Sequence, residues 1–372
     1  MAYKLVTKSG LNMFDMLSMM QKGIRRGLYS YAGFAANELE MSYRKAMWNR
    51  LLVISAEDCF GIITKEIVNL YKGNSNEDVS RAVALLCSAK KNRDACYFAC
   101  NFVLASRKTR DIEIKSMHTA KAAWRHSKNE LGYNQFGFEQ CSLFGDEGED
   151  NASDEDAKAV KAGARLESAL LHDDADMAGY EMDYLRKEHR SYLWQIFKEM
   201  VQRYNDEMIA DEIKALEKAD EIVNGRKKDK DEIFISKAAT IFLQGRSMYE
   251  KLLNANKIIG SHLIDWSKYK VMPMSECNLP GNGDIPEWVY DCHTLKGKRE
   301  GKTDWDMTRT EELALNPKQD ALFDEGSWLY TYEQDLQNKD ITEEDMKPIR
   351  EYAKTHAANP LPVVPYLESC SI

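Results

Sequence analysis

The distribution of proline constrains this fold more than any other sequence feature. All eight prolines lie at or after Pro273, so the first 272 residues contain none. Those residues are rich in Ala, Leu, Met, Glu and Lys, which favour helices. Because the loops of β-sandwiches and βαβ arrays usually carry proline, the sequence predicts an all-α fold.

Composition divides the chain into four segments. Residues 1–130 are predicted to form a basic helical bundle. Residues 131–156 are predicted to be an acidic linker, because residues 142–156 contain seven acids and no base. Residues 157–265 form a long helical middle region in this prediction. Residues 266–372 contain all the prolines and are expected to be irregular with short helices, packing over the helical body without forming a sheet of their own.

Local signals give more detail within the first segment. A first helix is predicted through the apolar positions Met13, Met16, Leu17 and Met20, and it is expected to end near Gly27. Gly73-Asn74-Ser75-Asn76 predicts a turn in which Ser75 or Asn76 caps the next helix. Cys96 and Cys100, four residues apart, are expected to be buried in the core.

The charge of the chain is unevenly distributed. Residues 1–130 hold 21 Lys+Arg and 12 Asp+Glu, a net charge of +9, and the rest of the chain carries −18. The basic residues are expected to form a surface for nucleic-acid phosphates or an acidic partner. One alternative is that these cations simply end helices favourably, and another is that the acidic residues 142–156 cover them. The candidate binding residues are Arg25, Arg26, Arg44, Lys45, Arg50 and Lys108.

Three stretches together carry a family resemblance: Met20–Gly27 (MQKGIRRG), Tyr43–Asp58 (YRKAMWNRLLVISAED) and Val103–Thr109 (VLASRKT). The first 110–130 residues resemble the C-terminal helical domain of the replication-associated recombination ATPases, the MgsA/RarA group of AAA+ proteins. Two positions depart from the family pattern. The family has a glycine directly after the apolar residue that follows Glu-Asp, where this chain has Phe60 and Gly61. Arg107 stands where the family has a proline. Residues 289–303 are similar to an Asp-x-His-Thr element of stand-alone relatives, some carried by phages.

The resemblance implies a helical, oligomer-forming domain that works in DNA replication or recombination. A homotetramer is the family's expected assembly. The ATPase module of the family does not precede this region in the sequence, so neither ATP hydrolysis nor helicase-like action is expected.

The segment KGKREGKT from Lys296 to Thr303 ends like a phosphate-binding P-loop. A P-loop needs four residues between its glycines, whereas Gly297 and Gly301 enclose three, and no β-strand is predicted before it. The segment therefore predicts a basic surface loop, or a loop that contacts phosphates of a nucleic-acid backbone. Its candidate ligand-binding residues are Asp291, His293, Lys296, Lys298, Arg299 and Lys302.

No metal and no cofactor are expected. Cys292 and His293, even beside Asp291, do not supply the ligands of a tetrahedral zinc site, and the chain has no Cys-x-x-Cys pair. Because His293 has no identified catalytic partner, a structural hydrogen bond is favoured over catalysis.

The leading hypothesis is a non-catalytic, homo-oligomeric protein that binds DNA or replication and repair proteins. One alternative is an enzyme that acts on a phosphorylated or nucleotide substrate at Asp291, His293 and the loop from Lys296 to Lys302. Another is a structural protein that sequesters a partner. No secretory signal or apolar run of membrane-spanning length is evident, and eight cysteines are too few for a disulfide scaffold. A cytoplasmic protein without a membrane partner is therefore expected.

Overall fold

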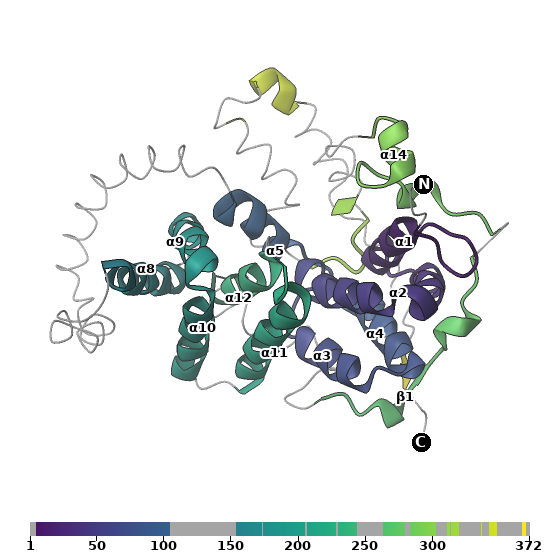
Figure 1. Ribbon diagram of the computed structural model, residues 1–372, viewed down its shortest axis with the longest axis horizontal. Coiled ribbons are helices and arrows are strands. Elements are labelled where there is room, and N and C mark those ends of the chain that lie inside the picture. Colours follow the sequence, from purple (N-terminus) through teal and green to yellow (C-terminus); the bar gives the residue numbers. More distant parts are fainter. Residues whose placement is uncertain are drawn as a thin grey trace.

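A computed structural model shows an all-α chain (Figure 1), as the sequence predicts. The structure describes residues 5–104, 154–172, 174–204, 207–227, 230–243, 263–279, 283–302, 311–312, 314–319, 336, 342–347 and 367–369. Lys108 and most of the predicted acidic linker lie outside these ranges.

Four helices form the N-terminal bundle: α1 (Met13–Arg25), α2 (Tyr29–Glu57), α3 (Thr64–Gly73) and α4 (Asn76–Ser88). The end of α1 is confirmed, since Gly27 follows it with φ +67°, a conformation that glycine adopts without a Cβ clash. The cap of α4 is also confirmed. Ser75 Oγ accepts from the Asp78 backbone N–H, and the Asp78 carboxylate accepts from the Ser75 backbone N–H.

After α4, helix α5 (Asp94–Tyr97) continues into a π-helix, η1 (Phe98–Val103). Phe98, Phe102 and Val103 occupy the buried side of this turn. Cys96 is half-buried and Cys100 is exposed. The predicted burial of Cys100 is therefore wrong, because the aromatic side chains take up the core-facing positions.

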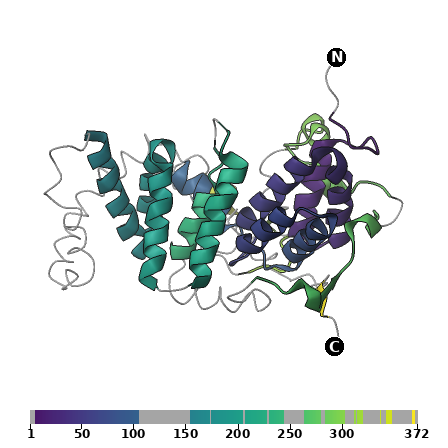
Figure 2. The same ribbon diagram turned by 60° about the horizontal axis from the view of Figure 1, so that its bottom comes forward.

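The middle region is a set of separate helices: α8 (Asp154–Leu171), α9 (Ala175–Glu188), α10 (Arg190–Tyr204), α11 (Glu207–Asn224) and α12 (Ile233–Leu243). Every residue of α12 is buried. This helix packs against α8, α10 and α11 of the middle region and against α2 and α5 of the N-terminal half. Figures 1 and 2 show the middle helices standing beside the N-terminal bundle, with α11 next to it. The N-terminal and middle helices therefore share one continuous hydrophobic core.

The C-terminal segment packs over the bundle, as predicted. Its described elements are short: η4 (Trp266–Lys268), β1 (Tyr269–Val271), η5 (Met274–Glu276), η6 (Glu287–Val289), α14 (Leu295–Arg299) and β2 (Leu367–Ser369). Within this segment the three-residue strands β1 and β2 pair antiparallel. The pairing satisfies backbone groups that irregular chain would leave open. Among the described helices, none combines the length and apolar character needed to cross a lipid bilayer.

Candidate functional site

The basic last turn of α1 faces the C-terminal segment. The Lys22 ammonium lies 2.7 Å from an Asp291 carboxylate oxygen. It also donates to the backbone oxygens of Trp288 (3.0 Å) and Val289 (3.2 Å). Both charged side chains are largely buried. Lys22 therefore holds the 288–291 segment against α1 with three hydrogen bonds.

Arg25 is buried among three carboxylates. Its guanidinium contacts Asp58 at 2.8 Å, Glu57 at 3.2 Å and Glu311 at 3.3 Å. Asp58 is fully buried, and this burial raises the pKa of its carboxyl although Arg25 and Arg93 oppose the shift. A buried charge that loses its partners is costly, so each member of this group depends on the others.

Arg26 completes the attachment. Its guanidinium pairs with Glu311 at 2.9 Å and lies 4.6 Å from the ring centre of Trp288. Burial alone would raise the pKa of Glu311, yet Arg26 and Arg25 hold that pKa below its ordinary value. Backbone bonds continue the contact: Asn316 donates its N–H to the Arg25 oxygen at 2.7 Å.

These contacts correct the prediction for two residues. Arg25 and Arg26 were expected on a binding surface, but they are 6% and 8% exposed and paired with carboxylates. Their described acidic partners lie in the bundle and the C-terminal segment, not in the acidic linker. We call this group of six residues the charge clamp: Lys22, Arg25, Arg26, Asp58, Asp291 and Glu311.

Other predicted basic residues stay at the surface. Lys45 is exposed. Arg44 is half-buried, with an ion pair to Glu40 and hydrogen bonds to Asn74 and Asn76. Arg50 is half-buried too and donates to the Gln21 side chain at 2.7 Å. Of the basic candidates in the N-terminal segment that the structure describes, those on α2 are therefore the ones that stay at the surface.

The predicted ligand loop forms a short helix, α14, in which Gly297 is the buried residue, rather than a phosphate-wrapping turn. Asp291 Oδ1 accepts from the backbone N–H groups of His293 (2.8 Å) and Thr294 (3.2 Å). Thr294 in turn caps α14. A Cβ at Gly297 would lie 1.9 Å from the Asp291 carbonyl oxygen, and Gly301 has φ +72°. Both glycines of the P-loop-like segment thus have a structural explanation.

Two of the four loop cations are paired with one carboxylate. Lys296 and Lys302 approach Glu287 at 2.8 Å and 2.6 Å. These ion pairs lower the pKa of Glu287 to about 2. Lys298 and Arg299 are exposed. The loop therefore offers a phosphate less positive charge than its sequence indicates.

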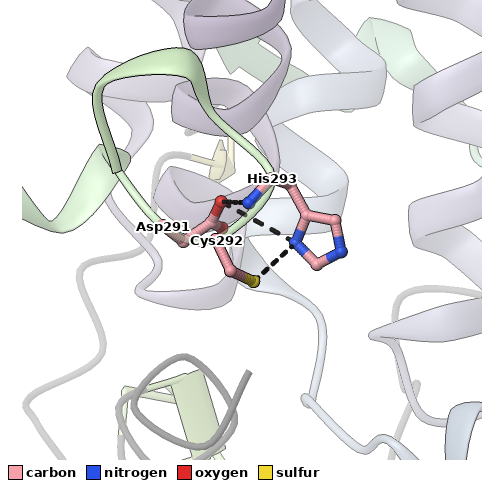
Figure 3. A group of neighbouring side chains, drawn as sticks. All are labelled: Asp291, Cys292 and His293. Carbon is pink, nitrogen blue, oxygen red and sulfur yellow. Dashed lines mark hydrogen bonds and ion pairs between the residues drawn. The ribbon is translucent and has the colours of Figure 1, made fainter. Parts of the chain in front are cut away.

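Asp291, Cys292 and His293 have ligand-type atoms within 4.8 Å of one another, as Figure 3 shows. His293 Nδ1 lies 3.2 Å from Cys292 Sγ and 3.8 Å from an Asp291 oxygen. Within the described ranges, this is the group with metal-ligating potential. Zinc binds such donors, but a cation here would compete with the Lys22 ammonium for Asp291.

The sequence reasoning missed Asp58 and Glu311 as members of the charge clamp. Asp58 ends the stretch Tyr43–Asp58 that carries the family resemblance, so the sequence holds a signal for it, whereas Glu311 lies outside the three stretches of the resemblance. No protein-family model, curated protein or solved structure matches the chain. The likeness to the MgsA/RarA domain therefore stays a prediction.

Proposed function

We propose that this chain is a non-catalytic DNA-binding protein of replication or recombination, and that α2 carries part of its binding surface. The single observation behind this proposal is that an arginine fixed by hydrogen bonds, Arg44, is adjacent to an exposed lysine, Lys45. Arg44 donates to Asn74 Oδ1 at 2.8 Å and to Asn76 Oδ1 at 2.9 Å, beside the exposed Lys45. Arg44 also donates to Glu40 and to the Asn74 carbonyl oxygen, so one Nη2 N–H remains for a phosphate. A guanidinium fixed in this way loses little side-chain entropy when it meets a phosphate.

The neighbouring groups support a phosphate contact. Trp48 donates to the same Asn74 oxygen at 2.8 Å, which fixes the turn between α3 and α4. Asn74 and Asn76 add polar side chains, and side-chain amides are common donors to backbone phosphates. Glu40 pairs with Arg44 and reduces the local positive charge. We therefore expect weak binding that depends strongly on salt.

The biological process and the assembly come from the family resemblance alone. Replication or recombination, a homotetramer and a cytoplasmic location belong to this proposal as the expected setting. A replication or repair protein with an acidic surface is the alternative partner for the same basic residues.

The test is a gel-shift titration at low salt with single-stranded and duplex DNA. The triple variant Arg44→Glu, Lys45→Glu and Arg50→Glu should bind at least about tenfold more weakly than wild type. The control reverses three exposed lysines of α8 and α9, at the other end of the molecule (Figure 1): Lys158, Lys161 and Lys187. Thermal unfolding checks that each variant is folded.

Equal affinity of wild type and the α2 variant would contradict DNA binding at this surface. Absence of any shift with wild type would overturn the DNA proposal and favour a protein partner. The enzyme hypothesis at Asp291 and His293 has less support, because Asp291 holds Lys22 and Glu287 holds two loop lysines.

A further inference from the structure

Helices α3 and α11 line a solvent-open pocket of about 270 Å³ that no sequence motif indicates. Each helix contributes one face. The lining positions on α3 and those on α11 both follow the i, i+3, i+4, i+7 spacing of a single helical face. The lining residues are Lys65, Val68, Asn69 and Lys72 of α3, Asp211, Lys214, Ala215 and Lys218 of α11, and Leu263.

A buried carboxylate holds the two helices in this arrangement. Glu212 of α11 is fully buried, and its oxygens accept from the backbone N–H groups of Thr64 and Lys65, each at 2.9 Å. Glu212 therefore satisfies the open donors at the start of α3. Since this contact fixes α11 against the first turn of α3, the pocket is preformed.

The pocket is strongly basic. Its lining contains four lysines and one aspartate. Asp211 lies 3.6 Å from Lys214, and Glu221, just outside the lining, lies 2.7 Å from Lys218. Lys65 is buried, so the exposed cations of the lining are Lys72, Lys214 and Lys218. Like charges along a helix–helix seam repel each other, so an anion bound between them would be stabilised.

One part of the lining is apolar. Val68 and Ala215 are buried, whereas Leu263 is 50% exposed at the pocket. An inorganic anion would use only the lysines. A ligand that has both a phosphate and a flat, weakly polar ring system would use the lysines and this apolar part together.

We propose that the pocket between α3 and α11 binds the phosphate of a nucleotide unit, with the sugar or base against Val68, Ala215 and Leu263. The unit comes either from a DNA strand or from a free nucleotide. The strand version rests on the proposed function: Lys72 lies two residues before Asn74, the residue that holds Arg44. A strand seated in the pocket therefore passes close to the α2 surface.

The variant for the test is Lys72→Gln, Lys214→Gln and Lys218→Gln. All three side chains are exposed, so the substitutions remove charge with little effect on folding. Lys158→Gln, Lys161→Gln and Lys187→Gln is the matched control. Fluorescence anisotropy with a labelled dT12 oligonucleotide tests the strand, and thermal stabilisation with a panel of nucleoside mono- and triphosphates tests the free ligand.

If a strand binds, the pocket variant should lose at least about tenfold in affinity for dT12. The slope of the logarithm of its association constant against the logarithm of the salt concentration should be smaller in magnitude than that of wild type by about 2. If a free nucleotide binds, wild type should be stabilised and the pocket variant should not. The proposal is overturned when the pocket variant matches wild type with both probes, or when wild type binds neither. If only the α2 variant loses DNA binding and no nucleotide stabilises wild type, the pocket proposal is overturned and the proposed function stands.

Discussion

Replacing Lys22 by methionine should release the segment around α14. The Lys22 ammonium donates to Asp291 and to two backbone oxygens, and the substitution removes all three hydrogen bonds. Asp291 would then stay largely buried without its counterion. Breaking a buried pair by removing one partner costs about 3–5 kcal/mol. We take the lower value, about 3 kcal/mol, because the segment can undock and rehydrate.

At about 1.4 kcal/mol per factor of ten, this loss raises the opening equilibrium of the segment about a hundredfold. Hydrogen–deuterium exchange of the peptide covering residues 286–302 measures that equilibrium. Its protected amides include those of Thr294, Lys298 and Lys302, whose hydrogen bonds within the loop open when the undocked segment unfolds locally. They should exchange about a hundredfold faster, while amides of α8 and α9 keep their wild-type rates.

Lys298→Met is the control, because it removes a lysine from the same loop at an exposed position. It should change exchange by less than about threefold. Adding Asp291→Asn to Lys22→Met should recover part of the protection, since an amide tolerates burial better than an unpaired carboxylate. The reasoning about the charge clamp fails if Lys22→Met exchanges within threefold of wild type, or if the Lys298 control loosens the loop equally.

Three further outcomes are expected. Gly297→Ala should destabilise α14 by about 1–3 kcal/mol in the same exchange experiment, because its Cβ would lie 1.9 Å from the Asp291 oxygen; wild-type exchange would contradict the packing. The ion pairs lower the pKa of Glu287 to about 2. The stability that this carboxylate contributes is therefore complete at pH values above the ordinary glutamate pKa and is lost as the pH falls through about 2. Carboxyl NMR titration should show this midpoint in wild type and a higher one in Lys296→Gln; equal midpoints would refute the ion pair. The pKa of Cys100 is lowered to about 7 by a hydrogen bond with Cys96, whereas burial raises the pKa of Cys59 and Cys87 to about 12. Iodoacetamide followed by peptide mass spectrometry should therefore label Cys100 with a half-maximal rate near pH 7 and leave both buried thiols unmodified, and the reverse order would contradict the described environment.

The elements that could be predicted from the sequence depend on nearby residues. Ser75 caps α4 through an N–H three residues away, and Gly27 ends α1 through its own backbone conformation. The all-α fold follows from the same kind of local preference summed over 272 proline-free residues. Boundaries within the middle region were not visible, because several short helices and one long helix share the same apolar spacing.

The site depends on distant residues, and there the sequence was less informative. Lys22 and its acceptor Trp288 are 266 positions apart, so nothing near α1 shows that its cations are neutralised internally. Arg25 and Arg26 look identical to surface cations until Glu311 is placed beside them. The lysines of α3 and α11 likewise have the spacing of a solvated face, and only the packing of the two helices brings them together.

Lysine footprinting with and without a DNA strand tests the central claim most directly. The claim is that Lys22 is internal, whereas Lys45 on α2 meets DNA; if the strand also occupies the α3–α11 pocket, Lys72 and Lys214 meet it too. Acetylation read out by peptide mass spectrometry should leave Lys22, which is 4% exposed, unmodified in both states. Lys45, Lys72 and Lys214 should be acetylated in the free protein. A 20-nucleotide single strand should protect Lys45, and also Lys72 and Lys214 if it occupies the pocket. Acetylation of Lys22 that DNA suppresses, with no protection on α2, α3 or α11, would contradict the account.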